Sequence, residues 1–258
     1  MNRALRIAPA LWLCARALAA SPDEIAAGAT FEPRVGREVP RDLVLHDEDG
    51  HTVRFGDFLG AAPVGVVLSY YGCSNLCPAV SRNLARRLAA AEGQASRIAQ
   101  VVVVSVDPGD TALAARQARR AALAGLPARE RARWHFLTGG PGEAGAIAGA
   151  VGFGFRRDPA SGQYAHPAAV TVLARDGRIS NYLLGFDYTS AELAAALAGA
   201  DRGRVADPLR RLVLVCFHYD LATSRTGAWI LGLLQALCLA MLACVLVLVA
   251  VRRGRARG

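Results

Sequence analysis

The sequence predicts an α/β fold, a central mixed sheet flanked by helices, and three observations lead to this class. Apolar runs typical of buried strands alternate with segments rich in Ala, Leu and Arg that are typical of helices. The order β-α-β-α-β-α predicts parallel strands joined by crossovers, and a hairpin on each side of this unit adds antiparallel pairing. The turn between the first of these strands and its helix carries Cys73 and Cys77. A cysteine pair at this place favours a thioredoxin-like version of the fold.

The elements follow in order from these patterns. An Asp-Gly turn, Asp47–Gly50, predicts a hairpin between Leu43–His46 and His51–Phe55. Apolar runs predict five further strands at Val64–Leu68, Gln100–Val106, Trp134–Leu137, Ala168–Ala174 and Arg178–Leu184. Helices are predicted at Ala79–Ala91, Thr111–Ala124, Glu143–Val151 and Ser190–Ala198, the second capped by Thr111 or Asp110. Phe153–Arg157 is expected to be extended and Asp158–Gly162 to form a turn.

The two ends of the chain have the properties of targeting segments. Residues 1–20 resemble a secretion signal, with Arg3 and Arg6 before a short apolar centre and small residues before Ser21. Residues 227–251 carry no charge and would span about 37 Å as a helix, enough to cross a bilayer with some tilt. The arginine-rich tail that follows is expected to stay in the cytoplasm.

These segments predict a single-pass protein of the inner (cell) membrane, with its domain in the periplasm or cell exterior and its C-terminus cytoplasmic. The predicted parts are listed in chain order: signal peptide 1–20, extended lead-in 21–40, folded domain 41–200, juxtamembrane linker 201–226, transmembrane helix 227–251 and basic tail 252–258. The formal net charge is +9 and every basic residue is arginine. Much of this charge lies at the two ends, so the sequence argues against nucleic-acid binding.

Cys73 and Cys77 are the candidate functional residues of the domain. Two cysteines four apart on the first turn of a helix lie on one face, and the helix N-terminus favours thiolate over thiol. Thioredoxin-type redox pairs have two residues between their cysteines, whereas here three residues, Ser74–Leu76, intervene. The wider spacing lets both sulfurs point at one object and still permits a disulfide. The pair is therefore either redox-active or half of a soft-metal site.

Two thiolates and one imidazole would suit Cu(I), a soft ion that accepts a low coordination number. The candidates for the third ligand are His46, His51, His135, His166 and His218. His166 is the best placed, because it precedes the strand Ala168–Ala174, which is expected to lie beside Val64–Leu68 and to start at the edge that carries Cys73. Asp107 is interpreted as a turn residue at the end of a strand, and a place near the metal-binding loop is the alternative. Cys216 and His218 are interpreted as linker residues near the membrane, and an auxiliary soft-metal site is the alternative.

Several motifs together resemble the Sco/SenC family of copper chaperones. The matching segments are Tyr70–Pro78, Val104–Pro108 with Asp110 and Thr111, Trp134–Gly139, Val151–Phe153, Tyr164–His166 and Asp176–Arg178. The resemblance extends from about Pro40 to Ala200. It implies a membrane-tethered thioredoxin-like protein that binds a copper ion through Cys73, Cys77 and His166. The implied partners are the copper-site subunit of cytochrome c oxidase and a periplasmic thiol reductant.

The chain departs from the family pattern next to the expected ligands. Ser74 follows the first cysteine where the family often has proline, and Ala165 and Pro167 flank the histidine in place of Asp and Ser. The loss of the acidic neighbour removes a group that could orient the imidazole. Many family members are anchored at the N-terminus, whereas this chain is expected to be anchored at the C-terminus.

Three hypotheses about function remain open at the level of the sequence. The first is a copper-binding assembly factor for cytochrome c oxidase, a metallochaperone rather than an enzyme. The second is a thiol–disulfide oxidoreductase acting on periplasmic cysteine pairs through Cys73 and Cys77, and the same cysteines can serve both functions because metal loading requires reduced thiols. The third is a thiol peroxidase, for which the sequence shows no local motif.

Overall fold

The computed structural model describes residues 30–73, 76–157, 162–185 and 187–206. The chain divides into two compact units, and all of these residues belong to the unit formed by residues 28–218. The predicted signal peptide, the transmembrane helix 227–251 and the basic tail lie outside the described residues. Within the described part, no helix combines the length and apolar character that a membrane span requires.

The domain is built around a five-stranded sheet with strand order β5-β4-β3-β8-β9. Its strands are β3 Val64–Ser69, β4 Gln100–Ser105, β5 Trp134–Leu137, β8 Ala169–Leu173 and β9 Ile179–Leu184. β3, β4 and β5 run parallel, while β8 lies antiparallel to both β3 and β9. The predicted mixed sheet is confirmed, and β5 has the predicted bounds.

The pairing of β3 with β8 decides where the site lies. Val64 pairs with Leu173 and Val67 with Val170, so β8 begins at the edge of the sheet where β3 ends. Cys73 follows the end of β3 and His166 precedes the start of β8. The antiparallel register therefore brings the two residues to one edge of the sheet, as the sequence predicted.

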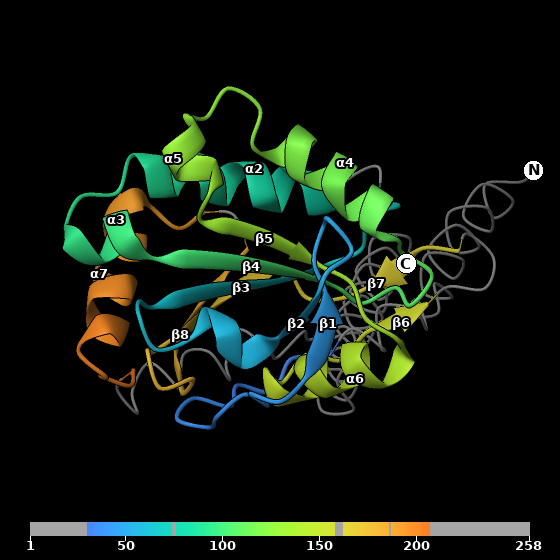
Figure 1. The fold of residues 1–258 in the computed structure, drawn as a ribbon. Coiled ribbons are helices and arrows are strands. Elements are labelled where there is room, and N and C mark those ends of the chain that lie inside the picture. The colour runs from blue at the N-terminus through green and yellow to red at the C-terminus, as the bar shows by residue number, and fades with distance from the viewer. Residues whose placement is uncertain (1–29, 74–75, 158–161, 186, 207–258) are drawn as a thin grey trace, which may run out of the picture. The chain divides into compact units, whose positions relative to one another are not determined.

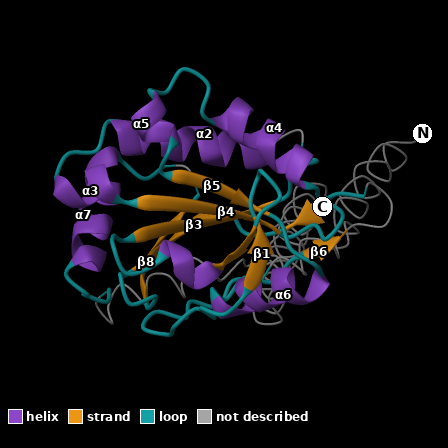
Figure 2. Ribbon diagram, viewed as in Figure 1, coloured by secondary structure: helices purple, strands orange, loops and turns teal. Residues whose placement is uncertain are grey.

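Helices cover both faces of the sheet (Figures 1 and 2). They are α2 Leu76–Ala89, α3 Gln94–Ile98, α4 Ala112–Ala122, α5 Ala128–Arg131, α6 Pro141–Ala150 and α7 Ser190–Asp201. One buried cluster joins α2, α4 and α7 to one face of the sheet, around Trp134 and Phe136. A second cluster joins α6 and the N-terminal segment to the other face, around Phe55 and Ile147.

Short elements complete the domain around the sheet edge. The predicted first hairpin is present as β1 Val44–His46 and β2 Thr52–Arg54, followed by the 3-10 helix η3 Phe55–Phe58. A further two-stranded ladder pairs β6 Arg156–Arg157 with β7 Tyr164–Ala165. The turn predicted at Asp158–Gly162 lies largely outside the described residues. β7 ends immediately before His166, so the β6–β7 ladder fixes the backbone that leads to this residue.

The start of α2 differs from the prediction. The helix begins at Leu76 rather than at Ala79, and Cys73 precedes it. The two cysteines therefore do not share the first helical turn. Instead, the backbone N–H of Cys77 donates to the sulfur of Cys73 over 3.4 Å, which satisfies one of the free donors at the helix start. Pro78 lies inside the first turn, where a missing N–H costs no helical hydrogen bond.

Candidate metal centre

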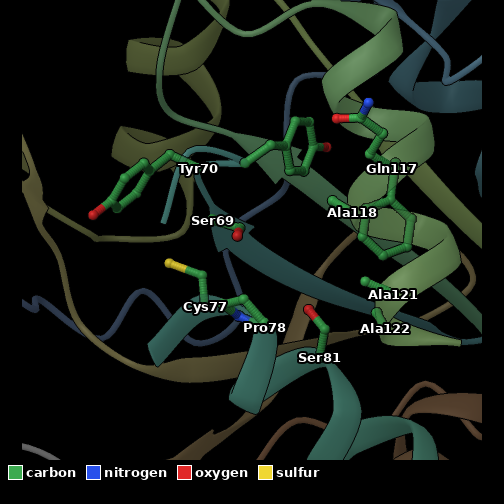
Figure 3. A pocket seen from close by; sticks show the side chains of 11 residues that line it. Ser69, Tyr70, Cys77, Pro78, Ser81, Gln117, Ala118, Ala121 and Ala122 are labelled. Atoms are coloured by element: carbon green, nitrogen blue, oxygen red, sulfur yellow. The ribbon is translucent and has the colours of Figure 1, made fainter. Parts of the chain in front are cut away.

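Cys73 and Cys77 lie together at the C-terminal edge of β3. Neither is part of a disulfide, and both side chains are buried, with exposures of 8% and 5%. Cys77 sits on the first turn of α2, where its sulfur points to the side of Tyr70 and away from α4 (Figure 3). The pair is shielded from bulk water but lies at the sheet edge where β7 and β8 converge.

His166 meets this pair from a segment far along the chain. Its Nε2 lies 3.5 Å from the Cys77 sulfur, although 89 residues separate the two positions. Its Nδ1 lies 3.0 Å from the carbonyl oxygen of Pro167. A carbonyl accepts only, so Nδ1 carries the proton and Nε2 presents its lone pair towards the sulfur. The carbonyl of Pro167 thus orients the ring in the place of the missing acidic neighbour.

The electrostatics of the site differ from the sequence expectation of a thiolate. Burial raises the pKa of Cys77 to about 12, against the opposing hydrogen bonds from the backbone of Tyr70 and the side chain of Ser69. Cys77 is therefore a thiol at neutral pH in the metal-free protein. Burial also lowers the pKa of His166, so its ring is neutral. The expected thiolate is wrong for Cys77 because loss of hydration outweighs the helix N-terminus.

The described candidate histidines other than His166 have partners other than the two cysteines. His51 lies 3.2 Å from a carboxylate oxygen of Asp47 in the first hairpin, and the ring of His135 lies 3.0 Å from the side-chain oxygen of Gln100. Burial lowers the pKa of His135. His46 belongs to β1, and its backbone pairs with Thr138. Cys216 and His218 lie outside the described residues.

The donor set fits a soft ion, although it is not closed around one. Within the described ranges, no three His, Cys, Asp or Glu side chains are arranged so that they could hold a metal as they stand. Cys77 and His166 are in contact, and Cys73 is hydrogen-bonded to the backbone of Cys77. Two sulfurs and one neutral imidazole are the donors that Cu(I) prefers. Closing this set requires an adjustment at Cys73, next to the undescribed residues 74–75.

Tyr70, Tyr164 and Asp107 lie around His166. The sequence alone did not assign them to the site. The ring of Tyr70 lies 6.2 Å from that of His166 in an edge-on arrangement and 5.3 Å from that of Tyr164. The Tyr70 hydroxyl donates to Gln163 over 2.9 Å, and the Tyr164 hydroxyl donates to Asp107 over 3.3 Å. Tyr70 and Tyr164 belong to motifs quoted above, but their spacing carries no sign that their rings would meet.

Asp107 and Asp110 make hydrogen bonds beyond the turn and capping roles that the sequence predicted for them. Asp107 accepts a hydrogen bond from the N–H of Gly109, as a turn residue should, and another from the hydroxyl of Tyr164. Asp110 is not the helix cap, because the side chain of Thr111 caps α4. One carboxylate oxygen of Asp110 instead accepts from the N–H of Tyr71 and from the hydroxyl of Ser105, each over 2.6 Å. It therefore ties the cysteine segment to the end of β4.

A cavity of about 230 Å³ adjoins the site between α2 and α4 (Figure 3). Cys77, Pro78 and Ser81 line it from α2, and α4 contributes Gln117 and three alanines. Tyr71 closes another side, with its hydroxyl donating to carbonyl oxygens of β4 and β5, the nearer at 2.7 Å. The cavity thus reaches the backbone of the cysteine segment from the side opposite to His166.

Comparisons with known proteins show which family model and which solved structures this chain is similar to. A family model described as SCO1/SenC matches residues 32–200. A protein of Aquifex aeolicus VF5 named for electron transfer is 24% identical with a TM-score of 0.56, covering 66% of this chain and 95% of its own. Arabidopsis thaliana ScoI with copper bound is 17% identical with a TM-score of 0.51, covering 62% and 96%. No curated protein matches the chain.

A third solved structure is BsSco, described as a member of the Sco family of cytochrome c oxidase assembly proteins with a disulfide switch. It is 19% identical with a TM-score of 0.53, and the match covers 66% of this chain and 97% of BsSco. At these identities the three structures establish the fold, and they confirm the predicted thioredoxin-like class.

Proposed function

Because the chain belongs to the SCO1/SenC family, we propose that it is a copper-binding assembly factor for the copper centre of cytochrome c oxidase. Copper is the cargo, and Cys73, Cys77 and His166 are its ligands. Arabidopsis ScoI, which shares the fold, is solved with copper bound, and BsSco is described as a cytochrome c oxidase assembly protein. The client is the copper-site subunit of that oxidase.

One observation carries this proposal, the 3.5 Å approach of His166 Nε2 to the Cys77 sulfur. The hydrogen bond to Pro167 keeps the proton on Nδ1, so Nε2 is available as a donor without losing a proton. The thiol of Cys77 has to release its proton when it binds copper, because only the thiolate is a ligand. Binding of Cu(I) is therefore a proton-releasing step, in which the proton comes from the thiol and not from the neutral imidazole.

The proposed topology rests on the predicted signal peptide 1–20 and transmembrane helix 227–251. These segments would export the domain to the periplasm and anchor it in the inner membrane by its C-terminal end. That compartment is oxidising, so a thiol reductant has to keep Cys73 and Cys77 reduced between rounds of copper loading.

A thiol–disulfide oxidoreductase is the second candidate function. Cys73 and Cys77 are buried and not joined in a disulfide, the backbone N–H of Cys77 donates to the sulfur of Cys73, and BsSco is described as having a disulfide switch. The two functions separate on His166, which copper binding needs and thiol exchange does not. Metal-free reduced protein that catalytically reduces an oxidised copper-site subunit, and that still does so after His166→Ala, would support this second function.

Copper binding by the purified full-length chain tests the first function. The parent is expected to bind one Cu(I), and His166→Ala is expected to weaken that binding at least about tenfold, since loss of an outer-shell partner alone costs that much. A competition titration with a Cu(I) chelator measures both quantities. His51→Ala is the matched control, because the side chain of His51 is 76% exposed and lies in the first hairpin. Parental affinity in His166→Ala would exclude His166 as a ligand.

A further inference from the structure

Helices α2 and α4 lie side by side over one face of the sheet (Figure 1). Residues of both helices line a groove between them. Its first part is the cavity of about 230 Å³ next to Cys77. Its second part, of about 390 Å³, is lined by Arg82 and Arg86 of α2. Ala121 and Ala122 of α4 line both parts, which makes them neighbouring sections of one α2–α4 groove. The groove connects the cysteine segment with two arginines.

Apart from Gln117, the α4 side of this groove is apolar. Ala118, Ala121 and Ala122 line the part near Cys77, and methyl side chains leave the space open that larger residues would fill (Figure 3). Leu113 belongs to the same helical face, because it precedes Gln117 and Ala121 by one and two steps of four residues. Leu113 is 61% exposed. An exposed apolar side chain therefore lies on the groove face near the start of α4, one turn beyond Gln117.

The α2 side of the groove is positively charged. Arg82 and Arg86 are exposed, and neither forms an ion pair with any residue in the part of the chain that the structure describes. None of the residues that line the two parts of the groove is acidic. The groove thus offers two unpaired guanidinium groups beside an apolar cavity, which is complementary to a carboxylate-bearing ligand with an apolar anchor.

We propose that the α2–α4 groove is the docking site of the protein that receives the copper. The partner presents an acidic segment to Arg82 and Arg86 and inserts one bulky apolar side chain into the cavity beside Cys77. This inference rests on the proposed copper-delivery function. It names the face of the domain to which the recipient binds.

Size and charge favour this occupant over the alternatives. The part of the groove beside Cys77 is smaller than the roughly 300–1,000 Å³ of typical small-molecule sites, and it suits a single anchoring side chain. A second copy of the chain, packed by a two-fold axis, would face its own arginines with arginines. An acidic lipid surface would meet the arginines but would leave the cavity next to Cys77 empty. A protein that approaches the cysteines from the α2 side covers both parts at once.

Copper transfer from the full-length protein tests the inference. The acceptor is the soluble copper-site domain of the cytochrome c oxidase subunit, and neocuproine, a small uncharged Cu(I) chelator, is the parallel acceptor. Arg82→Glu with Arg86→Glu is expected to lower the transfer rate constant to the protein about tenfold at low salt and to weaken its salt dependence. Ala121→Trp, which fills the groove from an exposed position, is expected to lower it by about fivefold or more. Transfer to neocuproine stays parental.

Matched variants control for general effects of charge and size. Arg97→Glu on α3 reverses an exposed arginine elsewhere, and Ala191→Trp adds the same bulk on α7, so both are expected to transfer copper at the parental rate. Parental transfer to the protein by both groove variants would overturn the docking site while leaving copper binding intact. Groove variants that also transfer copper more slowly to neocuproine would overturn it too, because the groove would then belong to the metal centre itself.

Two further outcomes would also overturn the inference. If the charge reversal abolished binding to phosphatidylglycerol vesicles but left transfer to the protein unchanged, the groove would face the membrane. If Ala121→Trp converted a dimer to a monomer without slowing transfer, the groove would hold a second copy of the chain. A parent protein that binds no copper would instead remove the proposed function, and the delivery face with it.

Discussion

Cys77 holds its proton firmly in the metal-free protein, because burial raises its pKa to about 12. A buried thiol of this kind resists oxidation and ionisation until a ligand compensates for the lost hydration. A bound cation supplies that compensation, since it stabilises the thiolate directly. His166 needs no such exchange, because its pKa is lowered and the ring is already neutral.

The apparent affinity for Cu(I) is therefore expected to rise with pH. Between pH 7 and 9 the thiol of Cys77 remains protonated in the metal-free protein, so each binding event releases at least that proton. Release of one proton strengthens the apparent binding about tenfold per pH unit, and His166 does not oppose the trend because it is already deprotonated. A competition titration at several pH values, corrected for protonation of the chelator, measures the slope. A flat profile would show that Cys77 is already a thiolate or is not a ligand.

Element ends, rather than element interiors, hold the site together. The carboxylate of Asp110 joins the turn after β4 to the segment after β3 through Tyr71 and Ser105. The Tyr164 hydroxyl joins β7 to the same turn through Asp107. These two connections fix the segments that carry Cys73 and His166 relative to each other.

Asp110→Ala is expected to lower the free energy of unfolding by about 1–3 kcal/mol, because it leaves the buried hydroxyl of Ser105 and the N–H of Tyr71 without their acceptor. Chemical denaturation of the parent and the variant measures this difference. Thr111→Ala is the comparison, since it removes only the helix cap at an exposed position and is expected to cost about 1 kcal/mol. A variant at Asp110 as stable as the parent would contradict the role assigned to this carboxylate.

Local pattern predicted the strands of the central sheet well and the shortest helices poorly. Strand β5 was predicted residue for residue, because Trp134–Leu137 is apolar and bounded by polar and glycine residues. The helices Gln94–Ile98 and Ala128–Arg131 were missed, since five or four residues give no helical period to recognise. The start of α2 was placed too late, since Pro78 belongs to the first turn of the helix, where proline is tolerated.

At the scale of the whole molecule, the order of the strands makes the site. Cys77 and His166 are brought together only because β8 returns antiparallel beside β3, the pairing that the sequence predicted. The contacts of Tyr70, Tyr164 and Asp107 around His166 were not predictable, because they depend on side-chain directions from three separate segments. The pKa of Cys77 was misjudged for a related reason, since its burial comes from the packed domain and not from its neighbours in sequence. The membrane segments remain predictions from the sequence.

X-ray absorption at the copper edge of the copper-loaded full-length protein tests the central claim most directly. Two sulfur ligands and one imidazole nitrogen are expected around the copper. In His166→Ala the nitrogen signal is expected to be lost while both sulfurs remain. Two sulfurs without nitrogen in the parent protein, or a spectrum unchanged by His166→Ala, would contradict the assignment of Cys73, Cys77 and His166 as the copper ligands.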